Sequence, residues 1–247
     1  MLVGTTPLEQ LVSKLPTIPS WKVEPVELKN VEILQAQFEL AAADIERFLP
    51  PALHPTIPPL GQWSCWDVPD SPWGSFRLVQ FRFSCRSGAR PRAFLLGALI
   101  DNEDAQKNLS ENWGLEATQA DIHFLRSYDA AEFQASVNDQ IAIDIKLRDP
   151  ESLSTTDLQL FASMHGANTP SGLRLVQFDP SYEVNRTERY MPTINRFDAK
   201  AWQQEGIDPV YAVTAWGANT SIHLPKIRFV CRPDIDAFRG TESVQDA

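Results

Sequence analysis

The sequence predicts a β-rich α+β fold, in which strands form a barrel or cone and only a few short helices occur. Short strand-like segments with turn signals between them follow one another along most of the chain. No internal repeat, low-complexity segment or linker divides the 247 residues, and a chain that is 43% hydrophobic can bury one large core. Closing the sheet would remove its exposed edges.

The N-terminal part is predicted to differ from the rest of the chain. Residues 1–20 are expected to form a loosely attached arm, because Pro7, Pro16 and Pro19 interrupt any long helix or strand. Residues 21–247 are expected to form the single domain.

The first part of the domain is predicted to be mostly strand. Residues 31–40 show a strand pattern, and residues 41–49 fit a short helix that ends at the following prolines. Residues 63–67 alternate briefly. Two longer strands are expected over 75–85 and 92–101.

These two long strands carry the most informative side chains. Alternation places Leu78, Gln80 and Arg82 on one face of the first strand. The second strand is apolar on both faces and is expected to be central, and a close neighbour is expected at its Gly97.

The remainder is predicted to be strands with three further helices. A helix is expected over 101–111, where acidic residues come early, and shorter ones over 197–204 and 234–238. The further strands are expected over 119–126, 131–137, 140–148, 157–164, 172–178, 181–190, 209–216 and 220–231.

Composition excludes several functional classes. A net charge of -10 argues against a nucleic-acid or anionic-membrane surface. Cys65, Cys85 and Cys231 lack the spacing of a zinc site or disulfide framework and are expected to be buried thiols. No signal peptide or membrane-spanning run is recognised, so a cytoplasmic location is predicted.

Within residues 71–118, Asp101-Asn102-Glu103 is followed by Glu111-Asn112-Trp113-Gly114-Leu115. With this spacing after the two long strands, the chain resembles the acetoacetate decarboxylase-like superfamily. The resemblance implies a barrel or cone around an enclosed small-molecule pocket, and a possible homo-oligomer.

The departures from the family pattern concern its chemistry. The resemblance aligns Ala117 and Thr118 with the family's Schiff-base lysine and its lysine neighbour, and neither residue forms an imine. A family pocket carboxylate aligns with Leu78, and a pocket arginine aligns near Val31. Decarboxylation through an imine is therefore not expected.

Two pairs of side chains are candidates for the remaining chemistry. Glu103 and Glu111 are eight residues apart and near one helical face, where one could act as a general acid or base. The alternative is a structural role for both. Arg82 and Gln80 could hold a carbonyl or carboxylate, or Arg82 could pair with an acidic neighbour instead.

Aromatic residues are expected to line the pocket together with small or apolar ones. The predicted substrate-binding residues are Gln80, Leu78, Trp113, Trp63, Trp66 and Ala117. For each tryptophan the alternative is ordinary core packing, whereas the resemblance places Trp113 near the former lysine. The four histidines are scattered, without metal-ligand spacing, and each is expected to be hydrogen-bonded or on the surface.

The leading hypothesis is an enzyme without a Schiff base or cofactor that acts on a largely apolar small-molecule intermediate. The loss of charged pocket groups favours a cyclase, isomerase or dehydratase of secondary metabolism. One alternative is a non-catalytic binding protein of the same fold. Another is a decarboxylase or aldolase that uses a displaced lysine.

Overall fold

The computed structural model describes residues 2–12, 14–41 and 45–244. The helices are α1 (Leu8–Leu11), α2 (Glu103–Trp113) and α3 (Ala237–Gly240), with 3-10 turns η1 (Ile45–Phe48) and η2 (Thr155–Asp157). The strands are β1 (Val26–Ala41), β2 (Leu53–Pro55), β3 (Leu60–Val68), β4 (Phe76–Ser87), β5 (Arg90–Ile100), β6 (Thr118–Gln119), β7 (Asp121–Arg126), β8 (Ala130–Val137), β9 (Gln140–Ser152), β10 (Ser163–Thr169), β11 (Gly172–Phe178), β12 (Ser181–Phe197), β13 (Asp208–Leu224), β14 (Phe229–Cys231) and β15 (Thr241–Ser243).

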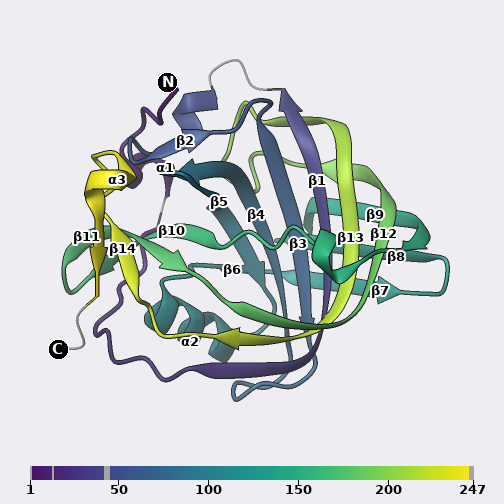
Figure 1. The fold of residues 1–247 in the computed structure, drawn as a ribbon. Coiled ribbons are helices and arrows are strands. Elements are labelled where there is room, and N and C mark those ends of the chain that lie inside the picture. The colour runs from purple at the N-terminus through teal and green to yellow at the C-terminus, as the bar shows by residue number, and fades with distance from the viewer. Residues whose placement is uncertain (1, 13, 42–44, 245–247) are drawn as a thin grey trace.

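All of these strands belong to one strongly curved sheet (Figure 1). Its order is β15-β14-β11-β10-β5-β4-β3-β1-β13-β12-β9-β8-β7, with β2 and β6 added beside β4 and β5. The predicted β-rich α+β class is confirmed. The predicted barrel or cone is not, because this hydrogen-bonded path is open and does not join β7 to β15.

Strand β5 is central, as its two apolar faces predicted, but one of its edges is only partly paired. On that side β10 pairs with Ala93 and Phe94, and β6 pairs with Leu99 and Ile100. Among the described residues no strand pairs with 95–98 on this side. The sheet therefore has a gap beside the middle of β5.

Helix α2 is tied to the start of β4 by the residues that precede it. The Asn102 side chain caps the helix by accepting from Ala105 N at 2.9 Å, and it donates to Ser75 O at 3.0 Å. Asp101 accepts from Arg77 N at 2.6 Å. The Asp-Asn-Glu sequence thus joins a strand, a helix and a loop.

The C-terminal end of α2 turns sharply into β6. Gly114 closes the helix with a φ of 71°, a conformation that favours glycine. The buried face of the helix, formed by Ala105, Leu109 and Trp113, packs in a hydrophobic cluster on one face of the sheet.

The N-terminal arm is packed rather than loosely attached. Leu8 and Leu11 are buried in one hydrophobic cluster, and Ile18 is buried in the other. A backbone bridge joins Thr17 to Asn168. Apolar residues between the prolines therefore fasten the arm to the domain, although no long element forms.

Several predicted boundaries differ from the structure. Strand β12 continues to Phe197, and turns follow it in place of the helix predicted over 197–204. Strand β13 joins the predicted segment 209–216 to the first part of the segment 220–231, whose last part is the separate strand β14. The strand predicted over 157–164 begins only at Ser163. The helix predicted over 41–49 lies partly outside the described residues, which show only η1 there. The predicted closing helix occurs later, as α3.

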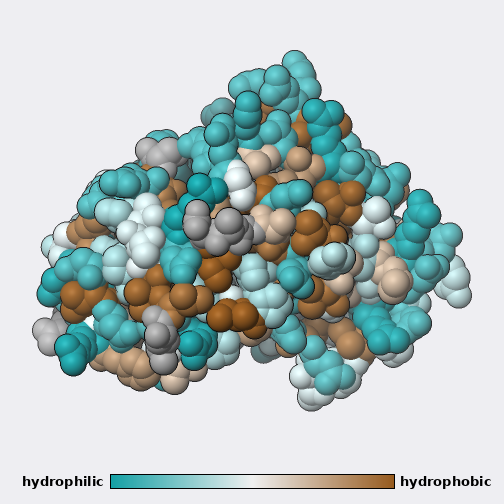
Figure 2. Space-filling model, turned by 90° about the horizontal axis from the view of Figure 1, so that it is seen from above, coloured by the Kyte–Doolittle hydropathy of each residue, from teal (hydrophilic) through white to brown (hydrophobic). Residues whose placement is uncertain are grey.

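The face of the molecule seen in Figure 2 is mostly polar, with apolar patches between polar side chains. The three cysteines are free and buried, which confirms their predicted state. Among the described residues no helix has both the length and the apolar character required to cross a membrane.

We predict that Asn102→Ala lowers the free energy of unfolding by about 1–2 kcal/mol, because it removes the helix cap. Urea denaturation monitored by circular dichroism measures this change. Asn108→Ala is the control, since its side chain contacts only Asp104 O within α2, and we expect a loss below about 0.5 kcal/mol. Equal losses in the two variants would contradict the capping role.

Candidate functional site

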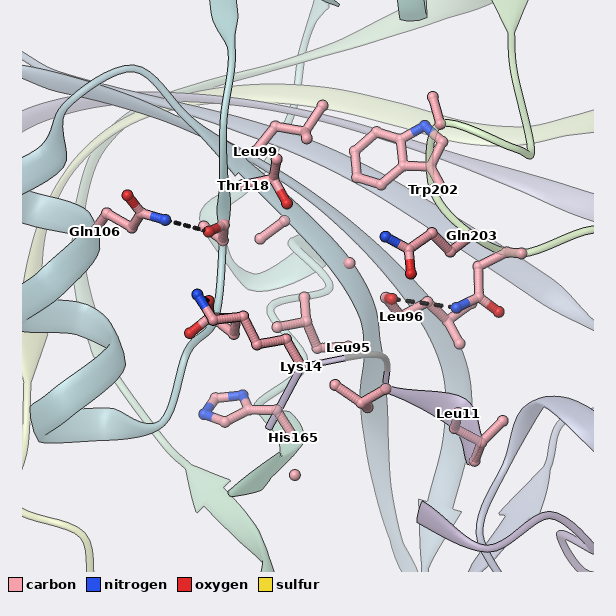
Figure 3. A pocket seen from close by; sticks show the side chains of 18 of the residues that line it. Leu11, Lys14, Leu95, Leu96, Leu99, Gln106, Thr118, His165, Trp202 and Gln203 are labelled. Carbon is pink, nitrogen blue, oxygen red and sulfur yellow. Dashed lines mark hydrogen bonds and ion pairs between the residues drawn. The ribbon is translucent and has the colours of Figure 1, made fainter. Parts of the chain in front are cut away.

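A cavity of about 230 Å³ lies at the gap beside β5 (Figure 3). The arm, the turn after α2, the start of β6, the middle of β10 and the turns after β12 all contribute walls. The lining residues are Leu11, Val12, Lys14, Leu95, Leu96, Gly97, Ala98, Leu99, Gln106, Gly114, Glu116, Ala117, Thr118, Gln119, His165, Gly166, Ala201, Trp202, Gln203 and Gln204.

The turns after β12 cover the gap because β5 lacks a side chain at Gly97. A Cβ at this position would lie 3.1 Å from Trp202 Cε3, so the predicted close neighbour of Gly97 is this indole ring. Its Nε1 donates to Ala142 O at 3.1 Å. Gln204 Nε2 donates to Leu96 O at 3.3 Å, which satisfies one backbone carbonyl of the unpaired edge.

His165 places a buried imidazole at this cavity. Its Nε2 lies 2.8 Å from Trp113 O, and because a carbonyl only accepts, Nε2 carries the hydrogen. Nδ1 is therefore a free acceptor, and it has no partner among the described residues. Burial lowers the pKa of His165 to about 4, against the opposing effect of the Trp113 hydrogen bond. The ring is neutral at neutral pH.

The arm supplies a cation to the same cavity. Lys14 Nζ lies 2.8 Å from Glu116 Oε1, and Ser110 Oγ donates to Glu116 Oε2 at 2.8 Å. The hydrogen bond and charge of Glu116 raise the pKa of Lys14, so the amine is held protonated. Figure 3 shows Lys14 and His165 on the same side of the cavity.

The positions that the resemblance aligned with the Schiff-base lysines also lie here. Ala117 is buried and Thr118 is exposed, and both line the cavity. Gln106 Nε2 donates to Ala117 O at 2.6 Å, and Gln119 Nε2 donates to Gln106 Oε1 at 2.6 Å. Of the predicted site residues, only Ala117 lines this cavity directly.

The predicted polar pair lies one strand away from the cavity. Arg82 and Gln80 are buried on the same face of β4 as Leu78. Their register partners on β5 are Leu95 and Ala98, which line the cavity. Among the described residues, no carboxylate forms an ion pair with the Arg82 guanidinium.

The two predicted acid-base residues lie elsewhere. Glu103 and Glu111 are both exposed on α2, and neither lines the cavity. Spacing placed them near one helical face, but that face points to solvent, because Ala105, Leu109 and Trp113 occupy the buried one. We therefore do not retain them as catalytic candidates.

The remaining predicted residues are core residues. Trp63 stacks on Phe81 with ring centroids 4.4 Å apart, and Trp66 packs with Leu78 in the other cluster. Trp113 is buried, its Nε1 donates to Pro225 O at 2.8 Å, and its carbonyl orients His165. The Trp113 carbonyl thus fixes the orientation of the His165 ring, which lines the cavity.

Sequence reasoning missed Lys14, Glu116 and His165. Lys14 lies in the arm for which the sequence predicts loose attachment, and its neighbours in sequence carry no site motif. His165 was expected to be hydrogen-bonded or on the surface, and its Nε2 is hydrogen-bonded, but its buried Nδ1 has no partner among the residues that the structure describes. Its only local signal is the neighbouring Gly166, where a Cβ would lie 2.8 Å from a Leu8 methyl group. Among the described residues, no group of three or more His, Cys, Asp or Glu is placed to hold a metal.

Solved structures share this architecture. An acetoacetate decarboxylase structure matches with a TM-score of 0.73 and 13% identity, over 90% of each chain. The chain has the acetoacetate decarboxylase-like fold. The enzyme from Legionella pneumophila matches with a TM-score of 0.69 and 13% identity, covering 91% of this chain and 88% of that one.

The enduracididine biosynthesis enzyme MppR, complexed with pyruvate, also shares the fold. Its TM-score is 0.68 at 15% identity, over 91% of this chain and 92% of MppR. No family model and no curated protein matches the sequence.

We predict a pH dependence of stability that comes from His165. The unfolded chain binds a proton near pH 6.5, but the folded chain binds it only near pH 4. Stability therefore falls as the pH drops from about 6.5 toward 4. Between pH 7 and pH 5 this group should remove on the order of 2 kcal/mol.

Urea denaturation at both pH values, compared between the wild type and His165→Asn, measures this contribution. His123→Gln is the control, because His123 is exposed. The same pH dependence in wild type and His165→Asn would show that the buried imidazole is not held neutral.

Proposed function

We propose that this protein is an enzyme that moves a proton on a small, largely apolar carbonyl compound, without an imine and without a cofactor. The reaction type is an isomerisation, cyclisation or dehydration. The observation that carries the proposal is the unpartnered Nδ1 of His165, a buried acceptor at a cavity that also receives the Lys14 ammonium. Together they can remove a proton and stabilise the resulting negative charge.

The proposed proton transfer uses only groups that line the cavity. His165 Nδ1 takes a proton from the carbon next to the carbonyl, and the electron pair moves to the carbonyl oxygen. The Lys14 ammonium donates a hydrogen bond to that oxygen, while Glu116 holds the ammonium. In a β,γ-unsaturated carbonyl compound, return of the proton from His165 to the γ-carbon moves the double bond into conjugation and completes an isomerisation.

Several features oppose imine chemistry at this cavity. Ala117 and Thr118 have no amine. A nucleophilic lysine needs a lowered pKa, whereas Glu116 raises the pKa of Lys14. The reaction is therefore assigned to proton transfer rather than to covalent catalysis.

A role in natural-product biosynthesis is part of the proposal. MppR, which shares the fold, is an enduracididine biosynthesis enzyme. It has been solved with the condensation product of pyruvate and imidazole 4-carboxaldehyde. This supports the use of the fold in such a pathway, and the cavity residues of the present chain provide the chemistry.

We predict that the protein accelerates hydrogen–deuterium exchange next to the carbonyl in a panel running from acetone and cyclohexanone to 5-oxohexanoate. Proton NMR in D₂O measures the rate. His165→Gln should reduce the enzymatic rate by about 100-fold or more. His123→Gln, which alters an exposed histidine, should keep the full rate. Specific binding without exchange of any panel member would favour the non-catalytic binding protein instead.

Borohydride reduction tests the absence of an imine. After incubation with pyruvate and sodium borohydride, we expect the intact mass of the protein to remain unchanged. An enzyme that forms an imine between pyruvate and its catalytic lysine serves as the positive control. An adduct on Lys14 would mean that its amine is nucleophilic and would overturn this part of the proposal.

A further inference from the structure

Arg82 is a buried cation whose hydrogen bonds are mostly long. The residue is only 5% exposed to solvent. Nη1 donates to Phe161 O at 3.4 Å and to Ser163 Oγ at 3.3 Å. Nη2 donates to Gln35 Oε1 at 2.9 Å and to Ser64 Oγ at 3.3 Å. Nε has no partner among the described residues, so the charge is contacted only by neutral groups.

A polar row crosses four strands beside this guanidinium. Trp216 on β13 is in register with Gln35 on β1, which is in register with Ser64 on β3, and Ser64 with Gln80 on β4. Residues in register point to the same face of a sheet. Trp216 Nε1 and Gln80 Nε2 are buried without partners among the described residues. With Arg82 Nε, three free N–H donors share this face.

Other partly buried arginines of the chain have carboxylate partners. Arg92 Nη1 lies 2.7 Å from Asp179 Oδ1. Arg126 Nη2 lies 2.7 Å from Glu188 Oε2. An unpaired buried charge is costly, and burial lowers the pKa of Arg82, although a guanidinium stays protonated. Among the described residues, Arg82 thus differs from these arginines in having no anionic partner.

The segment over this row packs on the core through Leu158 and Leu160, but its polar contacts with the row are long. Residues 153–162 are exposed or half-buried along their whole length. Gln35 Nε2 donates to Gln159 O at 3.4 Å, and Arg82 reaches Phe161 O at the same distance. These bonds are longer than usual, and a charged acceptor would form shorter and stronger ones. An anion placed beside Arg82 would therefore compete well with these two long bonds.

The row also adjoins the cavity of the proposed enzyme. Arg82 is in register with Leu95, which lines the cavity. Arg82 also contacts Ser163, and His165 follows two residues later on the same face of β10. Alternate residues of a strand are about 7 Å apart. A molecule whose chain is several bonds long can therefore extend from Arg82 to His165.

We propose that Arg82, Gln80 and Trp216 bind the carboxylate of an organic acid. A carboxylate only accepts hydrogen bonds and carries the charge that Arg82 lacks, so it matches the three free donors. The inference rests on the proposed function and narrows its substrate to an acid with an apolar body, whose reacting carbon lies several bonds from the carboxylate.

Isothermal titration calorimetry with hexanoate and with hexanamide tests the site, because the two ligands differ only in the charged group. We expect hexanoate to bind the wild type at least tenfold more tightly than hexanamide. Arg82→Gln should abolish this preference, whereas Arg92→Gln should keep it. Equal affinities for both ligands, or no binding of hexanoate, would overturn the proposal.

Trp216→Phe provides a second test if Arg82→Gln does not fold. Its indole N–H has no partner in the described part of the chain, so the variant should keep the wild-type melting temperature. Its affinity for hexanoate should fall severalfold, with hexanamide unaffected. An unchanged affinity for hexanoate would remove Trp216 from the site.

His165→Gln separates this site from the proposed function. It should lose hydrogen–deuterium exchange and keep the preference for hexanoate. Exchange that depends on His165, without any preference for hexanoate, would refute the carboxylate site alone. A preference for hexanoate without exchange in the wild type would refute the proposed reaction alone.

Discussion

The unpaired edge of β5 at residues 95–98 is the constraint on which the rest of the site depends. Strands β10 and β6 both pair with β5, but at opposite ends, so a gap remains between them. Exposed backbone groups in such a gap need partners. Gln204 bonds Leu96 O, and Trp202 packs over Gly97. The gap thereby becomes a walled cavity rather than an open edge.

The two cationic side chains near this gap, Lys14 and Arg82, have opposite surroundings. Lys14 is exposed and paired with Glu116, and it stays protonated at the cavity. Arg82 is buried and surrounded by neutral hydrogen-bonding groups. An exposed pair contributes little to stability, and a buried unpaired charge lowers it. Neither arrangement is explained by its contribution to stability.

The acetoacetate decarboxylase-like fold persists here at 13–15% identity because it rests on general patterns. Strand register needs alternating apolar residues, and α2 needs Asn102 at its start and Gly114 at its end. None of these requirements includes a lysine at position 117 or 118. The scaffold can therefore keep its shape while the groups in the cavity change.

The sequence by itself determined the β-rich class, strands β4 and β5, helix α2 and the shared face of Gln80 and Arg82, because these follow from local hydrophobic patterns and helix-compatible composition. Only the tertiary structure decided that Glu103 and Glu111 face solvent, and that Lys14 and His165 meet at one cavity. These two residues are 151 positions apart. Local periodicity carries no information on contacts of that separation, which arise only when the arm and β10 pack beside the gap in the sheet.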